Sequence, residues 1–402
     1  MSKLRSRRGS SAVFLCMVLA TLVAISLGLI YSAREYGAAS RVNAVSELAM
    51  QSVLSEFDYD VQKDYGIFLI RGSNDELRSC YLRYLNHSLK TMKDADVSDI
   101  RVSCGAYNVS DVSLVRDQIL EYMKYAEVKG LAEMFTGKND VINNLPEREL
   151  NHGPTRVSLP SRSLPAKSLL DMAEGIGNSL SDIQSALSEG TEKYLLGSYI
   201  MKHFNNCHTL QDDTHFFRNE VEYILAGKYT DKKNADSVER ALKAMRIPLN
   251  LAHIYSDPEK QALILAAAEA TSGPFAGLTQ LVIATTWAYA ESDNDVNLLR
   301  EGYKVPITKD KASWATDLDG IASAERGAPF KPEVNTGLTY EQYLQILLYF
   351  RDDNLKTARI MDLIQINMRK KHDGGFVINE YSTGITVSIN VNGKTYRNEK
   401  KY

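Results

Sequence analysis

Hydrophobic residues form their longest uninterrupted run near the N-terminus. No charged residue occurs from Gly9 to Ala33, and the apolar core of this run extends from Ala12 to Tyr31. A helix rises about 1.5 Å per residue, so this run is long enough to cross a hydrocarbon core of about 30 Å. We therefore predict a transmembrane helix at 12–33. A cleaved signal peptide is the alternative, but the length of the run and the bulky Tyr31 at its exit favour a retained anchor.

After the anchor the hydrophobic pattern becomes periodic. No proline occurs from residue 32 to residue 57, so nothing forces the helix to end there. We predict that the membrane helix continues into a helical stalk at 34–65, with a kink at Gly37 as the alternative. The apolar positions at helical spacing are Val42, Val45, Leu48, Ala49 and Val53.

Most of the remaining chain also shows helical spacing. Three segments differ. Residues 99–112 alternate in part and are interpreted as strands, and Ile67–Ile70 is interpreted as a short buried strand. Residues 375–396 alternate more clearly and contain an Asn392-Gly393 turn, which predicts a C-terminal β-hairpin. Helices are predicted at 74–92, 113–135, 169–187, 194–204, 234–252, 258–272, 274–291 and 340–371.

The fold class predicted from these elements is α+β and mainly helical, with one large domain at 66–402 after the anchor and stalk. A sub-boundary is possible at 136–167. That segment is polar and carries four of the ten prolines of the chain, Pro146, Pro154, Pro160 and Pro165.

Charge sets the expected orientation. Lys3, Arg5, Arg7 and Arg8 lie in residues 1–11 with no acidic residue, and the positive-inside rule keeps such a flank in the cytoplasm. The bulk of the chain is then extracytoplasmic, and the cell membrane is the expected location. The net charge of −3 provides no general attraction to nucleic acid, so no nucleic-acid partner is expected.

The cysteines do not define a disulfide framework. Cys16 lies in the predicted membrane segment, which leaves an odd number outside it, namely Cys80, Cys104 and Cys207. Whether Cys80 and Cys104 pair is open at this point.

One group of potential metal ligands stands out. His203, His208 and His215 lie close in sequence, with Cys207, Asp212 and Asp213 between them. His203 and His208 are five residues apart, which does not place them on one helix face, and the group matches no known ligand spacing. A polar loop after a helix is the favoured interpretation, and no metal or cofactor is expected.

A second group consists of carboxylates. Glu291 ends the predicted helix 274–291, and Asp293 and Asp295 follow it. Paired carboxylates serve acid–base catalysis or calcium binding, but the calcium-loop pattern would need Gly and Glu where Leu298 and Lys304 stand. We interpret the group as a solvated helix end or as N-cap chemistry. The common phosphate-loop and hydrolase motifs do not occur in the sequence, so no enzymatic activity is predicted.

Two sets of residues carry a family resemblance. The N-terminal pattern comprises the basic flank, Gly9-Ser10-Ser11, the apolar helix and the stalk ending in Asp64-Tyr65-Gly66-Ile67-Phe68. It resembles TadE/TadG-type pseudopilin-like proteins of tight-adherence (Flp, type IVc) pilus systems. The downstream blocks resemble a Gram-positive family of membrane proteins with a domain of unknown function. These blocks are Glu222-Tyr223-Ile224-Leu225, Trp287-Ala288-Tyr289-Ala290-Glu291-Ser292, Val305-Pro306-Ile307, Gly337-Leu338-Thr339-Tyr340 and Arg359-Ile360-Met361-Asp362-Leu363-Ile364-Gln365.

The pilus resemblance implies a possible processing site between Gly9 and Ser10. Prepilin substrates carry Glu at the fifth residue after the cut, where this chain has Phe14, so processing is not favoured. The expected function is a non-enzymatic, membrane-anchored component of a tight-adherence-type pilus or secretion assembly, with other assembly proteins as partners. An anchored extracellular binding or sensor module is the alternative, and an anchored hydrolase is the third.

Overall fold

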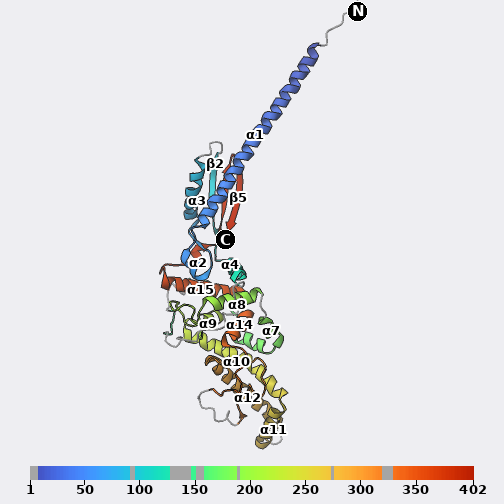
Figure 1. The fold of residues 1–402 in the computed structure, drawn as a ribbon, viewed down its shortest axis with the longest axis vertical. Helices are drawn as coiled ribbons and strands as arrows, with labels where there is room; N and C mark the ends of the chain where they lie inside the picture. The colour runs from blue at the N-terminus through green and yellow to red at the C-terminus, as the bar shows by residue number, and fades with distance from the viewer. Residues whose placement is uncertain are drawn as a thin grey trace, which may run out of the picture. The chain divides into compact units, whose positions relative to one another are not determined.

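The computed structural model describes residues 8–90, 96–126, 146–150, 158–187, 191–272, 276–318 and 329–402. The fold is mainly helical with a small antiparallel sheet (Figure 1). It divides into two compact units that interleave in sequence. The first unit contains residues 1–58, 68–108 and 380–402, and the second contains residues 59–67 and 109–379. The division therefore does not fall at 136–167, which lies within the second unit; of that segment, 136–145 and 151–157 are outside the described residues.

The first unit is built on one long helix, α1 (Arg8–Leu54), which has no break at Gly37. This confirms the predicted continuity of the helix. Side chains of residues 12–33 are exposed throughout, and this part of α1 extends beyond the sheet of the same unit (Figure 1). Lys3, Arg5 and Arg7 lie outside the described residues, whereas Arg8, Gly9 and Ser10 form the start of α1.

The second half of α1 is part of the core and not a free stalk. Val42 and Val53 are completely buried, and Ala38, Ala39, Ala49, Met50 and Leu54 are nearly so. This face packs against α3 (Asn74–Leu89) and the strands β4 (Gly384–Val391) and β5 (Lys394–Lys401). The helix ends at Leu54 rather than at residue 65, and residues 59–65 form a separate helix, α2 (Tyr59–Tyr65). The predicted stalk at 34–65 is therefore corrected: periodic apolar residues on α1 signalled packing within a domain.

The sheet of the first unit has the order β2–β4–β5 and is antiparallel throughout. Strands β4 (Gly384–Val391) and β5 (Lys394–Lys401) form the predicted hairpin. Asn392 and Gly393 connect them with φ of 51° and 81°, the left-handed backbone that a tight two-residue hairpin turn requires. Strand β2 (Val97–Ser103), which is distant from the hairpin in sequence, pairs with β4.

Two strand predictions were too long. Residues 105–107 form a 3₁₀ turn and helix α4 starts at Val112, so the strand predicted at 99–112 ends at Ser103. In the segment 67–70 only Ile70 joins a strand, β1 (Ile70–Arg71), which pairs with β3 (Tyr381–Ser382).

The second unit is helical in its described part. In helix α15 (Asp353–Lys371) every side chain from Leu355 to Met368 is buried. The helices are α2 with α4 (Val112–Ala126), α6 (Leu169–Gly177), α7 (Leu180–Ala186), α8 (Glu192–His203), α9 (Glu220–Ala226), α10 (Asp231–Ser256), α11 (Pro258–Ser272), α12 (Ala276–Arg300), α14 (Tyr340–Phe350) and α15 (Asp353–Lys371).

Three helix predictions need correction. The helix predicted at 169–187 is two helices, and the one predicted at 340–371 is interrupted after Phe350, where Asp352 caps the start of α15 through a hydrogen bond from the Leu355 N–H. Helix α12 continues past residue 291 to Arg300. Glycines do mark two of these boundaries, since α6 ends at Gly177 and the left-handed Gly302 follows the end of α12, whereas no glycine or proline separates α14 from α15.

The packing of α1 on α3 includes one buried polar contact. The hydroxyls of Ser46 and Tyr81 lie 2.7 Å apart, and both residues are fully buried. We predict that Ser46→Ala lowers the free energy of unfolding by about 1–2 kcal/mol, because the Tyr81 hydroxyl stays buried without its partner. Chemical unfolding of the full chain in detergent measures this. Ser55→Ala, which removes an exposed hydroxyl near the end of the helix, serves as control, and equal losses in both variants would contradict the prediction.

Candidate functional site

The carboxylates singled out in the sequence lie inside a helix. Glu291 and Asp295 are one turn apart on α12, and both are completely buried. The prediction of a solvated helix end was therefore wrong for these two residues. Asp293 points the other way: half of its side chain is exposed, and it pairs with Lys243 of α10. Glu291 and Asp293 therefore do not form a carboxylate pair.

Two buried cations neutralise Glu291 and Asp295. The Lys309 ammonium contacts both carboxylates, at 2.6 Å from Asp295 Oδ1. Arg246 of α10 donates from Nε to Asp295 Oδ2 at 2.9 Å. Asn250 Nδ2 donates to the same oxygen, also at 2.9 Å. Burial acts to raise the pKa of Asp295, but Arg246 and Lys309 outweigh it and hold the pKa below its ordinary value.

These charged groups also form hydrogen bonds with the backbone of residues 305–316, which lack regular secondary structure. Arg246 Nη1 donates to the carbonyls of Pro306 and Ile307 at 2.9 and 2.8 Å. Glu291 accepts the N–H groups of Ala315 and Thr316 at 3.1 and 2.8 Å. Buried backbone groups outside regular structure need such partners. The network thus fixes residues 305–316 against α10 and α12, and its oxygens are occupied by protein groups rather than open to a substrate.

The histidines of the sequence candidate separate into two places. His203 and His215 both lie near the ring of Tyr65, at centroid distances of 6.4 and 6.2 Å. His208 instead lies 4.9 Å from the ring of Tyr340. Among the described residues, no three His, Cys, Asp or Glu side chains converge in a way that would hold a metal ion.

The pKa values of the two histidines near Tyr65 are shifted in opposite directions. Burial, assisted by the charge of Lys202, lowers the pKa of His203 to about 4. Its Nδ1 lies 3.1 Å from the Asp64 carbonyl. Burial also disfavours the cationic form of His215, but Glu220, 2.7 Å from its Nδ1, outweighs this and raises the pKa. His203 is therefore neutral at pH 7, which suits an aromatic core residue.

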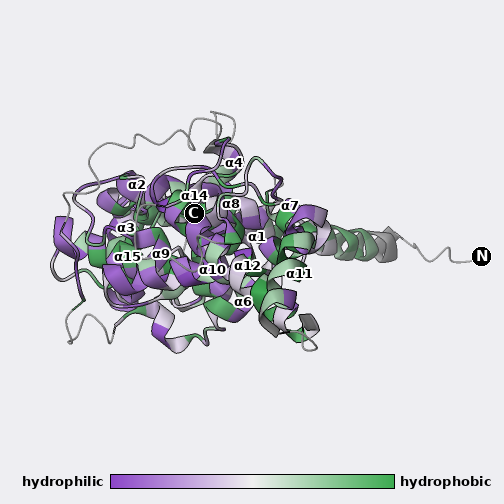
Figure 2. Ribbon diagram, turned by 90° about the horizontal axis from the view of Figure 1, so that it is seen from below, coloured by the Kyte–Doolittle hydropathy of each residue, from purple (hydrophilic) through white to green (hydrophobic). Residues whose placement is uncertain are grey.

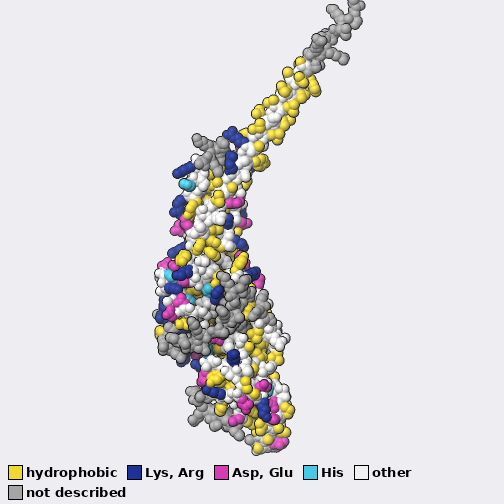
Figure 3. Space-filling view, in the orientation of Figure 1, with side chains coloured by type: hydrophobic (Ala, Val, Ile, Leu, Met, Phe, Trp, Pro, Cys, Tyr) yellow, Lys and Arg dark blue, Asp and Glu magenta, His cyan; other side chains and the backbone are white. Residues whose placement is uncertain are grey.

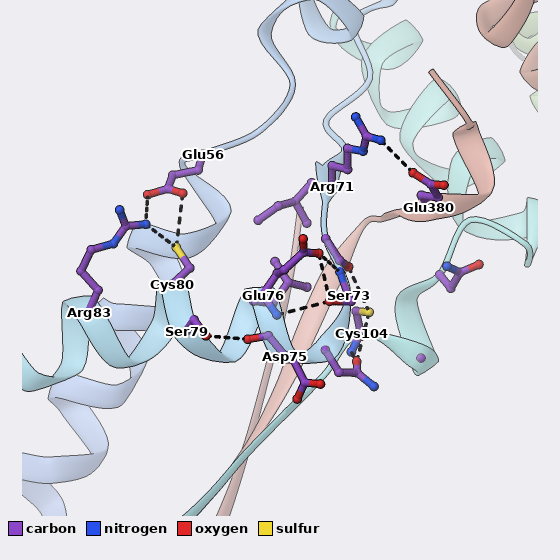
Figure 4. A pocket seen from close by; sticks show the side chains of 16 residues that line it. Glu56, Arg71, Ser73, Asp75, Glu76, Ser79, Cys80, Arg83, Cys104 and Glu380 are labelled. Carbon is purple, nitrogen blue, oxygen red and sulfur yellow. Dashed lines mark hydrogen bonds and ion pairs between the residues drawn. The ribbon is translucent and has the colours of Figure 1, made fainter. Parts of the chain in front are cut away.

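A site that the sequence did not indicate lies in the first unit. It is an open hollow of about 1200 Å³ near the N-terminal end of α3, formed by segments distant in sequence (Figure 4). Its lining includes Glu56, which follows the end of α1, together with β1, α3, the Cys104–Gly105 segment and Glu380. No local sequence signal was available for it, because only the fold brings these pieces together.

Charged side chains of the hollow are mostly paired with each other. Arg71 and Glu380 lie 3.0 Å apart across it. On another side Glu56 accepts hydrogen bonds from Arg83 at 3.2 Å and from the Cys80 thiol at 3.2 Å. Burial contributes most to raising the pKa of that thiol.

Cys80 and Cys104 are both free thiols, which answers the question that the sequence left open. Figure 4 shows them at separate places in the hollow, Cys80 beside Glu56 and Cys104 at the opposite end of the α3 segment. The Cys104 thiol lies 3.3 Å from Asn74 Oδ1.

The fold and these sites define a mainly helical protein with one long, apolar N-terminal helix and a polar hollow. Within the described part of the chain, Ala12–Leu54 is the one helix long and apolar enough to cross a membrane. Residues 116–393 match the family of unknown function DUF5702, and the chain belongs to that family. No curated protein and no solved structure matches the chain.

The buried ion network predicts that removing one of its cations greatly lowers the free energy of unfolding. Lys309→Met leaves Glu291 and part of Asp295 without a counter-charge, and we expect a loss of about 3–5 kcal/mol in the free energy of unfolding. Lys311→Met is the matched control, because its partner Glu259 and its own side chain are largely exposed; no measurable change is expected. Denaturant unfolding of both variants checks this, and a Lys309→Met protein as stable as the control would refute a stabilising role.

His203 predicts a pH dependence with a defined sign. Its pKa in the folded protein is about 4, whereas an unfolded histidine titrates near 6.5. The unfolded chain therefore binds a proton that the folded chain excludes, and stability is lost as pH falls from about 6.5 towards 4. Between pH 7 and pH 4.5, we expect the free energy of unfolding of His203→Phe to fall by about 1–3 kcal/mol less than that of the wild type.

Unfolding free energies measured at both pH values decide this prediction. His87→Gln, which changes an exposed histidine of α3, should follow the wild type. Parallel pH curves for the wild type and His203→Phe would show that His203 is not the group responsible.

Proposed function

We propose that this protein is a non-enzymatic, single-pass membrane component of a tight-adherence-type pilus or secretion assembly in a Gram-positive envelope. It is pseudopilin-like in the use of its N-terminal helix. The N-terminal flank with Lys3, Arg5, Arg7 and Arg8 lies in the cytoplasm, and residues 66–402 lie outside the membrane. Its partners are the membrane and other assembly proteins, and nucleic acid is not among them.

The observation that carries the proposal is the dual environment of α1. Residues 12–33 expose their apolar side chains, and the same helix continues into the core of the first unit. A helix of this kind transmits the position of a membrane segment to the folded unit without a flexible joint. A pseudopilin-like subunit needs this property, because its helix packs laterally with other helices while its folded part remains outside.

The burial of α1 also favours a retained anchor over a cleaved signal. The small residues that a signal peptidase could use after the apolar run are Gly37-Ala38-Ala39-Ser40. Ala38 and Ala39 are buried and lie in the middle of α1. A cut there would remove the first turns of a helix that packs in a domain core.

The apolar half of α1 offers a face for lateral packing. Ala20, Ala24 and Gly28 recur at four-residue spacing, and small residues let membrane helices approach closely. A Cβ added at Gly28 would meet nothing within 4 Å, so the space beside the helix is open to a neighbour. Processing between Gly9 and Ser10 is not part of the proposal, since Phe14 replaces the glutamate that pilin-type substrates carry.

An anchored extracellular binding module is the second candidate. The hollow near α3, with its polar rim of Arg71, Glu76 and Glu380, is the observation that favours it. In that case a soluble or envelope ligand would occupy the hollow, and α1 would serve only as attachment.

The test is affinity purification of the C-terminally tagged full chain from crosslinked native membranes, with mass spectrometry of its N-terminus and partners. We expect a chain that retains residues 12–33, resists extraction by alkaline carbonate and carries pilus or secretion assembly proteins. Ala24→Leu should reduce these crosslinks severalfold by blocking close helix approach, whereas Val23→Leu, on the neighbouring helix position, should not.

Two results would count against the proposal. A chain that starts after residue 33 would mean that the apolar run is a signal peptide. An intact N-terminus with only envelope or polymer-linked partners would favour the binding module.

A further inference from the structure

The first unit has one end from which the apolar part of α1 emerges. Figure 2 shows this part of the helix in the hydrophobic colour. In Figure 3, Lys and Arg side chains gather where it joins the folded unit. Helices α1 and α3 and the strands β2, β4 and β5 all belong to this unit, so contacts with α1 give the level of each strand relative to the predicted membrane segment.

Strand β5 runs along α1 and starts beside the predicted membrane segment. The Lys394 Nζ lies 4.8 Å from the centroid of the Tyr36 ring, whereas at the other end of the strand the Lys400 Nζ donates to Gln51 Oε1 at 3.4 Å. At about 1.5 Å per helical residue, Tyr36 lies about 5 Å and Gln51 about 27 Å beyond Ala33. Lys394 is therefore the end of β5 nearest the membrane segment.

The lipid headgroup layer reaches the level of Lys394. This layer adds about 5–8 Å to each side of the hydrocarbon core, so it includes Tyr36 and Lys394 when residues 12–33 span that core. Tyr31 and Tyr36 expose 66 % and 64 % of their surface, and tyrosine is enriched at the boundary between lipid and water. The two exposed tyrosines lie on either side of Ala33, which supports this level for the boundary.

The end of α3 lies at the same end of the unit. Lys90 caps α3 and is exposed, and Figure 1 shows α3 ending where β2 begins. The N–H of Asp96, just before β2, donates to Asn392 Oδ1 in the turn between β4 and β5 at 2.9 Å. Lys90 therefore belongs with Lys394 to the part of the unit that is closest to the membrane segment.

Two arginines lie one level further from the membrane segment. Arg101 of β2 and Arg397 of β5 are both paired with Ser388 of β4, one on each side, and both are exposed. The next residue, Asn398, donates to Asn43 Oδ1 at 2.7 Å, about 15 Å beyond the predicted membrane segment. This level is within about one Debye length of the headgroup layer at physiological ionic strength.

The charge of these two levels is positive. Among the described residues, the basic ones are Arg34, Arg41, Lys90, Arg101, Lys394 and Arg397, and the acidic ones are Glu35, Asp96 and Asp99. Residues 91–95 contribute one charge of each sign in the sequence, so the excess of basic residues remains. The basic residues come from four elements, α1, α3, β2 and β5, so an extended anionic surface matches them better than a single small anion does.

We infer that this end of the first unit, defined by Lys90, Arg101, Lys394 and Arg397, binds anionic phospholipid headgroups. Lys and Arg near a membrane surface are attracted to anionic lipids, and they donate charge-assisted hydrogen bonds to phosphate. The inference rests on the retained anchor of the proposed function and adds the class of lipid that the folded part contacts. Headgroup binding fixes the first unit against the bilayer in addition to the helix that carries it.

The test is photocrosslinking of the full chain in phosphatidylcholine nanodiscs. The discs contain a small, equal fraction of one of two lipid probes, an anionic phosphatidylglycerol type or a zwitterionic phosphatidylcholine type, each with the same diazirine in its headgroup. Mass spectrometry should locate adducts at residues 392–397 and near residue 90, at least threefold more with the anionic probe. At 1 M salt, where the Debye length is about 3 Å, the two probes should give equal yields.

Two variants on the same strand separate headgroup binding from a general effect of charge. Lys394→Gln should lower the yield with the anionic probe about three- to fivefold, the effect of one basic residue near a charged membrane surface. Lys401→Gln is the matched control, because it removes the same charge from an exposed position of β5 at the far end, next to the residue that contacts Gln51. Its yield should equal that of the wild type.

Equal yields from the two probes at physiological salt, in a chain that retains residues 12–33 within the disc, would overturn the inference and leave the anchor intact. Equal losses in Lys394→Gln and Lys401→Gln would overturn it as well. Competition by millimolar soluble glycerol phosphate would assign the basic residues to a soluble phosphate ligand instead. A chain that does not enter the disc would remove the anchor and this inference together.

Discussion

One face of α1, with Val42, Ala49, Met50 and Val53, packs against α3 and the central strand β4 in the core of the first unit. The remainder of that unit depends on this contact. Its sheet has three strands and buries one face on α1, and a sheet of this size is stable only when such a face is covered. At its N-terminal end the same helix leaves the core, and its apolar side chains are exposed there. The domain and the predicted anchor therefore share one continuous backbone, and neither can be displaced without the other.

The second unit is organised by a different constraint, the need to satisfy buried polar groups. Residues 305–316 lie partly inside the unit without regular secondary structure, and their backbone groups need partners that a helix or sheet would otherwise supply. Arg246 supplies donors and Glu291 supplies acceptors, while Asp295 and Lys309 balance the charge. Ion pairs of this kind contribute little net stability over an apolar core, but removal of one partner is costly. The network therefore gives these charges on α10 and α12 a structural role.

The sequence predicted the elements whose signals are local. The uncharged run, the periodic apolar residues after it and the Asn392-Gly393 turn identified α1 and the β4–β5 hairpin, and the helix predicted at 258–272 matches α11. The break before Asp352 was missed because a capping aspartate in a charged stretch resembles an exposed helix residue. The stalk was misjudged for a related reason, since an amphipathic helix has the same spacing whether it contacts a domain or a partner.

The sites were less predictable than the elements. Glu291 and Asp295 looked solvated because their counter-charges, Arg246 and Lys309, lie far away in sequence. His203 and His215 meet around Tyr65 through tertiary packing, while His208, although closer to His203 in sequence, lies elsewhere. The hollow near α3 joins segments from residues 56 to 380, so no window of the sequence contains it.

Hydrogen exchange of the full chain in lipid nanodiscs tests most directly whether α1 belongs to both the membrane and the folded unit. The account predicts that amides of residues 42–54 exchange as slowly as those of β4, because both open only when the first unit unfolds. It also predicts that residues 12–33 are protected by lipid and lose this protection in a non-membrane solvent while residues 42–54 keep theirs. Rapid exchange at 42–54 while β4 remains protected would contradict the account, because the helix would then be a separate stalk.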